Sequence, residues 1–138
     1  MPNKRILVVD DEPDVLQGMH IRLGANHYDT FFAADAPAAV AEARTCKPDL
    51  VILDLGLPAG GGFVVIESLK AIPSLAGVPI IVVSARDVGP NEGRALKAGA
   101  DAFLQKPVDD AQLLAVIRQS LERPAPEETV PEPKTAVG

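Results

Sequence analysis

Three short runs of continuously apolar residues constrain the fold of this chain more than any other feature. They are ILVV at 6–9, LVIL at 50–53 and IIVV at 80–83, and β-branched residues are frequent in them. Strands that are buried on both faces have this composition, and such strands belong to parallel sheets. Two weaker strand candidates, residues 28–33 and 102–104, have sparser apolar patterns that suit the edges of a sheet.

Segments with helical periodicity separate these strands, so strand and helix alternate five times. The first three predicted helices are marked by Val15, Leu16, Met19 and Leu23 on one face, by Val40 and Ala43, and by Phe63, Ile66 and Leu69. The fourth spans about Asn91 to Ala98, and the fifth has Leu113, Leu114, Ile117 and Leu121 facing inward. This alternation predicts a parallel sheet with helices on both faces, and five strands are too few for a closed eight-stranded barrel. We therefore predict an α/β fold with a flavodoxin-like, doubly wound sheet in the order 2-1-3-4-5.

Side chains and glycines with known capping preferences mark the predicted helix ends. Asp11 or Asp14 lies near the start of the first helix, and Asp35 precedes the second. Asp109 or Asp110 precedes the fifth, and Gly99 follows the fourth, where a glycine commonly ends a helix.

A change in composition divides the 138 residues into one domain, residues 1–122, and a tail or linker, residues 123–138. The last segment has four prolines, three glutamates and no large aliphatic residue beyond valine, so it cannot bury enough apolar surface to order itself. No output domain is recognisable after Leu121. Both a stand-alone domain and a domain that precedes a further one stay open.

The charge and apolar pattern exclude several classes of protein. The net charge of −6 disfavours direct binding to nucleic acid or to an anionic membrane, because both require a basic face. No apolar run has the length of a transmembrane helix or of a signal peptide, so we expect a cytoplasmic protein. Cys46 is the only cysteine, and we interpret it as a small hydrophobe rather than a redox centre.

Polar residues follow four of the five predicted strands at the point where each strand ends. Asp10 and Asp11 follow the first strand, Asp54 the third and Ser84 the fourth, and Lys106 comes shortly after the fifth. In open parallel sheets, ligands bind beyond the carboxyl ends of the strands. The sequence therefore predicts that three carboxylates, one hydroxyl and one ammonium group converge at this edge.

Each of these residues has an ordinary structural explanation when it is taken alone. Acids suit the start of a helix, serine suits turns and lysine suits exposed surfaces. Their placement at corresponding strand ends favours a common site instead. Clustered carboxylates repel one another unless a cation intervenes, and Mg²⁺ prefers oxygen ligands. We predict a Mg²⁺ site at which the carboxylate of Asp54 can attack phosphorus.

In this order and spacing, the motifs resemble those of receiver domains of bacterial response regulators, the CheY-like family. The resemblance runs from about Lys4 to Leu121 and includes ILVVDDEPD at 6–14, LVILDLGLP at 50–58, Gly62, IIVVSA at 80–85 and GADAFLQKP at 99–107. It implies a phosphorylation-switched protein of two-component signalling, which catalyses only its own phosphoryl transfer and dephosphorylation. The implied partners are a histidine kinase or phosphotransfer protein and a downstream protein target, and a homodimer stays open.

The resemblance also implies the roles of residues around the acidic cluster. Asp54 corresponds to the phosphoacceptor. The Mg²⁺ ligands would be Asp11, Asp54 and the backbone carbonyl of Gly56, with Asp10 acting through a metal-bound water. Lys106 would contact the phosphoryl group. Glycine at position 56, where the family varies, leaves the site more open to water than a larger side chain would.

A second group of residues is implied in the response to phosphorylation. Ser84 would bind a phosphoryl oxygen, and its loop would move inward while the ring of Phe103 turns in. The peptide bond between Lys106 and Pro107 would be cis. Arg86 occupies another variable position that tunes the lifetime of the phosphorylated state, and the AGGG run at 59–62 suggests a mobile loop beside the acceptor.

Three other functions compete with this interpretation. Phosphatases and mutases with an aspartyl-phosphate intermediate carry a second aspartate two residues after the nucleophile, where this chain has Gly56. A flavin or dinucleotide module needs a phosphate-binding loop after the first strand, but the sequence there is DDEPD. A receiver fold that binds a partner without phosphorylation is the strongest rival. His20 and His27 do not have the spacing of a metal-ligand pair.

Overall fold

The computed structural model describes residues 3–58, 61–85 and 88–122. Its strands are β1 (Arg5–Val9), β2 (Asp29–Ala33), β3 (Leu50–Leu53), β4 (Ile80–Ser84) and β5 (Ala102–Gln105). Its helices are α1 (Pro13–Ala25), α2 (Ala36–Cys46), α3 (Gly61–Ala71), α4 (Val88–Ala98) and α5 (Asp110–Glu122). Arg86, the first part of the AGGG run and the proposed tail lie outside the described residues.

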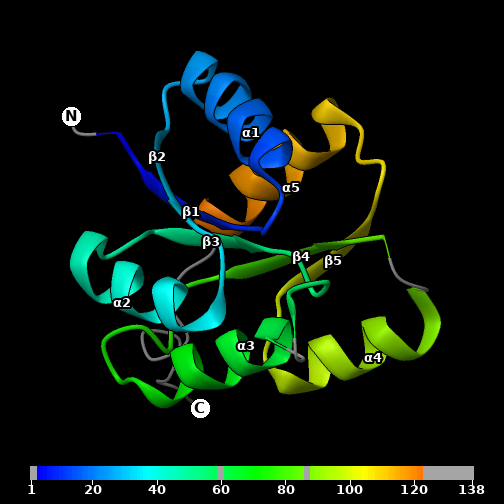
Figure 1. Cartoon of the computed structure of the whole chain (residues 1–138). Helices are drawn as coiled ribbons and strands as arrows, with labels where there is room; N and C mark the ends of the chain where they lie inside the picture. Colours follow the sequence, from blue (N-terminus) through cyan, green and yellow to red (C-terminus); the bar gives the residue numbers. More distant parts are fainter. Residues whose placement is uncertain (1–2, 59–60, 86–87, 123–138) are drawn as a thin grey trace, which may run out of the picture.

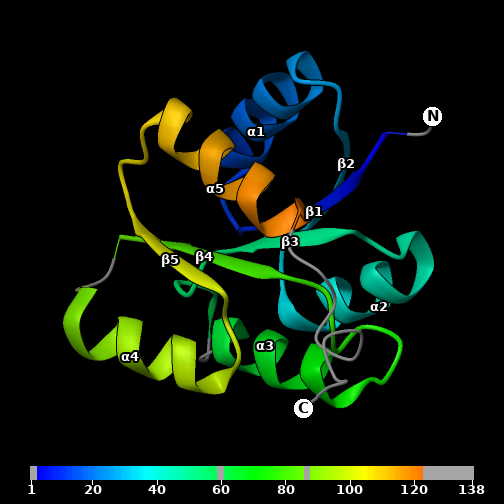
Figure 2. The same ribbon diagram turned by 180° about the vertical axis from the view of Figure 1, so that it is seen from behind.

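The strands form one parallel sheet in the order β2-β1-β3-β4-β5, with helices on both faces (Figures 1 and 2). Helices α1 and α5 cover one face, and α2, α3 and α4 cover the other. The predicted fold class and strand order are therefore confirmed. The two weaker strand patterns belong to β2 and β5, which lie at the edges of the sheet as expected.

Two apolar layers hold the helices to the sheet, because alternate residues of each strand point to opposite faces. Val51 and Leu53 belong to the layer beneath α2, α3 and α4, whereas Leu50 and Ile52 belong to the layer beneath α1 and α5. Every residue of β3 is buried, as expected of a central strand. The sheet is thus a rigid support for the residues that follow its strands.

The helix ends follow the expected chemistry with one exception. The side chain of Asp35 accepts a hydrogen bond from the backbone N–H of Ala38 at 2.8 Å, which caps α2. Asp109 accepts one from the N–H of Gln112 at 3.0 Å in the first turn of α5. Gly99, with φ of 124°, directly follows the last residue of α4, Ala98. Helix α1 lacks a side-chain cap at its N-terminus and begins at a proline instead. The side chain of Glu12, the residue that precedes the helix, therefore makes no capping hydrogen bond and can approach other groups.

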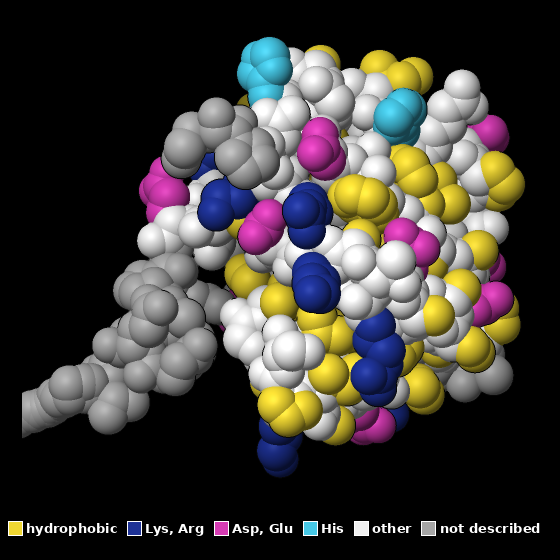
Figure 3. All heavy atoms as spheres, turned by 90° about the vertical axis from the view of Figure 1, so that its left-hand side faces the viewer, with side chains coloured by type: hydrophobic (Ala, Val, Ile, Leu, Met, Phe, Trp, Pro, Cys, Tyr) yellow, Lys and Arg dark blue, Asp and Glu magenta, His cyan; other side chains and the backbone are white. Residues whose placement is uncertain are grey.

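One side of the molecule carries a row of basic side chains (Figure 3). Figure 3 shows the left-hand side of Figure 1, where Lys and Arg side chains lie in a row among acidic and apolar ones. The carboxyl ends of β1, β3 and β4 lie toward the opposite side of the molecule.

Among the described residues, no helix has the length and apolar character that a membrane span requires.

Cys46 is buried at the end of α2. Burial raises the pKa of its thiol to about 11, with a further contribution from the negative charge of Glu42. A thiol that stays protonated at neutral pH is a poor nucleophile, so this environment favours the interpretation of Cys46 as a structural residue.

Candidate functional site

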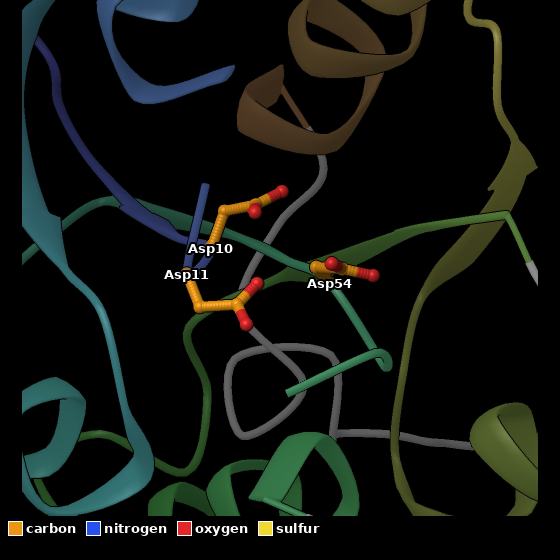
Figure 4. A group of neighbouring side chains, drawn as sticks. All are labelled: Asp10, Asp11 and Asp54. Carbon is orange, nitrogen blue, oxygen red and sulfur yellow. The ribbon is translucent and has the colours of Figure 1, made fainter. Parts of the chain in front are cut away.

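Three aspartates gather where the central strands end. Strands β1 and β3 are paired so that Val9 lies opposite Leu53, and Asp10 and Asp54 are the next residues on each strand. Carboxylate oxygens of Asp10, Asp11 and Asp54 lie within 4.8 Å of one another (Figure 4). The parallel register therefore brings together the acids that the sequence separates.

The two acids after β1 differ in how they are bound. Asp10 is 3% exposed, and both of its oxygens have partners: the backbone N–H of Glu12 donates to Oδ1 at 2.9 Å, and Lys106 Nζ donates to Oδ2 at 3.1 Å. Asp11 is exposed. Because Asp10 is already engaged, the solvent-facing Asp11 is better suited to bind a cation directly.

Lys106 provides the positive charge of the cluster. Its Nζ lies 3.1 Å from Asp10 Oδ2, 3.5 Å from Asp54 Oδ2 and 3.9 Å from Glu12 Oε1. Partial burial acts to lower the pKa of Lys106, but the hydrogen bond that its ammonium group donates to Asp10, together with the negative charges of Asp10, Asp54 and Glu12, outweighs burial and raises the pKa above its ordinary value. The ammonium group is therefore charged throughout the physiological pH range.

Asp54 combines a fixed orientation with access to solvent. Its Oδ1 accepts a hydrogen bond from the backbone N–H of Gly56 at 2.9 Å, while its side chain keeps 10% of its surface exposed. It lines a hollow of about 390 Å³ together with Asp11, Glu12, Gly56, Ser84, Ala85 and Lys106. The hollow is large enough to admit a cation and a phosphoryl group beside the carboxylate.

Ser84 and the segment after β5 complete the wall of the hollow. Ser84 is completely buried, and its backbone carbonyl accepts a hydrogen bond from the N–H of Lys106 at 2.9 Å. The peptide bond between Lys106 and Pro107 is cis, which is the conformation that the resemblance implies. Phe103 is half-buried and packs against the apolar layer beneath α2, α3 and α4. It is not among the residues that line the hollow.

Glu12 is a site residue that the sequence reasoning did not single out. It lines the hollow, its backbone N–H orients Asp10, and its carboxylate approaches the ammonium group of Lys106. Its position directly after Asp10 and Asp11 was the available signal, but only the fold brings it to Lys106.

Comparison with known proteins identifies this arrangement. The family model for the response regulator receiver domain matches residues 6–118. The chain belongs to this family. It is therefore a receiver domain of two-component signalling and not a classical enzyme. The acidic cluster, formed by Asp10, Asp11 and Asp54 with Lys106 beside it, lies at the carboxyl edge of its sheet.

Curated relatives and solved structures agree with this assignment. The receiver domain is 39% identical over 118 residues to the KDP operon transcriptional regulatory protein KdpE of Escherichia coli, covering 86% of this chain and 51% of that protein. It is 37% identical over 114 residues to the response regulator PleD of Caulobacter vibrioides, covering 83% of this chain and 25% of PleD. The chain thus spans between a quarter and a half of the length of these relatives.

Two solved structures have the same fold. A CheY-like receiver domain protein from Methanospirillum hungatei is 32% identical, with a TM-score of 0.79, and the match covers 87% of this chain and 94% of that one. The receiver domain of Klebsiella pneumoniae RstA, in a BeF3-activated form, is 29% identical with a TM-score of 0.80, covering 87% and 100% of the two chains.

Proposed function

We propose that this receiver domain accepts a phosphoryl group on Asp54 from a histidine kinase or a phosphotransfer protein in the cytoplasm. The observation that carries the proposal is the carboxylate of Asp54, which lines the hollow, has oxygens of two further carboxylates within 4.8 Å and lies beside the ammonium group of Lys106. An Asp54 oxygen attacks phosphorus while the bond from phosphorus to the donor's imidazole nitrogen breaks. The imidazole leaves with that electron pair, and Asp54 becomes an acyl phosphate.

The residues present fit a Mg²⁺ ion. Mg²⁺ binds through one or two carboxylates and phosphate oxygens while it keeps several waters. Asp11 and Asp54 would hold it directly, together with the backbone carbonyl of Gly56, and Asp10 would act through a bound water. When bound, the ion supplies positive charge that offsets the clustered carboxylates and the transferred group.

Lys106 and Ser84 would bind the transferred group. The ammonium of Lys106 already faces Asp54 Oδ2, so it can donate to a phosphoryl oxygen there with little rearrangement. Ser84 lines the same hollow, and its hydroxyl would supply a second donor. We propose that this draws the loop after β4 inward and lets Phe103 reorient. The surface formed by α4 and β5 would then change for a downstream protein.

A groove beside the hollow supports a site for the phosphoryl donor. It has a volume of about 610 Å³ and is lined mainly by apolar side chains of α1 and of the segment before α5, among them Val15, Met19 and Val108. Lys106 and Ala85 line both the groove and the acidic hollow. A protein that delivers a phosphoryl group to Asp54 would therefore cover this groove, and we propose the kinase or phosphotransfer protein as its occupant.

The central test is intact mass spectrometry of the protein after incubation with Mg²⁺ and acetyl phosphate. We expect one added phosphoryl group on the unaltered chain and none on Asp54→Asn, because the amide lacks the nucleophilic oxygen. Glu67→Gln, a change in the middle of α3, is the matched control and should be phosphorylated normally. An unmodified wild-type protein would support instead a binding module that works without phosphorylation.

The lifetime of the phosphorylated state gives a second prediction, at Gly56. A Cβ atom at this position would lie 3.2 Å from Asp54 Oδ2 and 3.3 Å from Oδ1. We expect Gly56→Met to slow hydrolysis of the acyl phosphate by about threefold or more, because a side chain here displaces attacking water. Gly56→Ala should have a smaller effect. The check is the decay of the phosphorylated mass after acetyl phosphate is removed, and faster decay in both variants would contradict the prediction.

A further inference from the structure

Over residues 91–98, where its side chains are described, helix α4 is held to the domain by few buried side chains. Among its residues 91–98, only Ala95 is buried, and it offers a single methyl group to the core. Leu96 is 43% exposed. Elements with few buried apolar contacts open locally at lower free energy than the core does. A contact made by an exposed side chain of α4 should therefore affect the position of this helix more than a similar contact affects a helix with more buried side chains.

Arg94 makes such a contact with α3. Its guanidinium carbon lies 3.8 Å from the centre of the Phe63 ring, which is a close cation–π arrangement. Phe63 is in the first turn of α3 and packs against the apolar layer of the sheet. The contact thus links an exposed residue of α4 to an anchored residue of α3, and the two helices lie on the same face of the sheet (Figure 1).

The first turn of α3 lies directly against the acceptor. A Cβ atom built on Gly62 would lie 2.6 Å from Leu55 Cα and 3.1 Å from the backbone carbonyl oxygen of Asp54. Leu55 itself is only 2% exposed. Because protein interiors are close-packed, a shift of the backbone at residues 54–55 cannot be absorbed there without moving this turn. Phe63, the next residue, would move with it.

We propose that Arg94 is a positioning residue that ties α4, through Phe63, to the backbone of the acceptor Asp54. This inference rests on the proposed function of Asp54. The contact stabilises the position of α4 that goes with the free carboxylate, so α4 must weaken it to adopt another position. Removal of the contact makes that change easier, which favours the conformation that accepts a phosphoryl group.

Hydrogen exchange of the unphosphorylated protein tests the contact itself. In Arg94→Gln and Phe63→Leu, we expect the amides of α4 to exchange about two- to fivefold faster, which is the effect expected from losing one exposed cation–π contact. The double variant should exchange no faster than either single variant, because both remove the same interaction. Arg94→Lys keeps the positive charge and should exchange more slowly than Arg94→Gln. Lys97→Gln, an exposed change in the last turn of α4, is the control and should match wild type.

The rate of phosphorylation by acetyl phosphate tests the link to Asp54. Arg94→Gln and Phe63→Leu should be phosphorylated about two- to fivefold faster than the wild-type protein. The control, Lys97→Gln, should be phosphorylated at the wild-type rate. Faster hydrogen exchange with an unchanged phosphorylation rate would show that the contact has only a structural role, and would overturn the proposal. Additive effects of the two substitutions on exchange, or unchanged exchange in the single variants, would overturn it as well. A wild-type protein that takes up no phosphoryl group would overturn the proposed function, and the coupling with it.

Discussion

Chelation of divalent cations is expected to abolish phosphorylation of this receiver domain by acetyl phosphate. Three carboxylates have oxygens within 4.8 Å of one another, and Lys106 is the one ammonium group that the described residues place beside them. An incoming phosphoryl group adds negative charge to this cluster. Without a divalent cation, the rate of phosphorylation should fall by at least about a hundredfold, because metal ions stabilise the transition state of phosphoryl transfer by several kcal/mol.

Intact mass spectrometry over time, with Mg²⁺, with EDTA, and with EDTA followed by excess Mg²⁺, measures this effect. Recovery in the third sample shows that chelation did not damage the protein. An adduct that forms at the same rate in EDTA would contradict a metal-dependent mechanism while leaving Asp54 as the acceptor.

Asp11→Asn separates metal binding from catalysis. A ligand that binds only the folded state raises the melting temperature, so Mg²⁺ should stabilise the wild-type protein. We expect this stabilisation to be lost in Asp11→Asn, because Asp11 is the acid of the cluster with free access to solvent. Asp14→Asn is the matched control: it removes an exposed acid from the first turn of α1, outside the cluster, and should retain the response. An equal Mg²⁺ response in both variants would exclude Asp11 as a ligand.

Much of this site follows from the sequence because it depends on backbone register. Continuous apolar runs indicate a parallel sheet, and a parallel sheet places the residues after its strands at one edge. Asp10 and Asp54 are adjacent because Val9 pairs with Leu53, and Ser84 reaches the same edge because β4 pairs with β3. No detail of side-chain conformation is needed for this step.

Contacts between side chains on separate elements were not predictable in the same way. The approach of Glu12 to Lys106 depends on the conformation of two loops, and the stacking of Arg94 on Phe63 depends on where two helices lie on the sheet. The start of α4 was also placed too late, at 91 rather than at Val88, because its first residues lack an apolar period. These features depend on tertiary structure, which local patterns do not encode.

Gly62→Ala is expected to lower the free energy of unfolding by about 2–3 kcal/mol, although alanine favours helices. The added methyl carbon would lie 2.6 Å from Leu55 Cα, and a backbone atom cannot rotate away as the end of a flexible side chain can. Either α3 or the segment after Asp54 must shift. The sequence contained this glycine as part of a motif, but only the structure gives the physical reason for it.

Gly93→Ala is the matched control, since Gly93 lies within α4 and a Cβ atom there would meet nothing within 4 Å. It should raise stability by about 0.5–1 kcal/mol, because alanine loses less backbone entropy than glycine in a helix. Urea unfolding followed by circular dichroism measures both changes. Because the displaced segment carries Asp54, Gly62→Ala should also weaken the stabilisation by Mg²⁺, whereas Gly93→Ala should leave it intact. If Gly62→Ala proved as stable as Gly93→Ala, the close approach of α3 to the acceptor segment would be refuted, and with it the rigid connection through which a phosphoryl group on Asp54 would move α3.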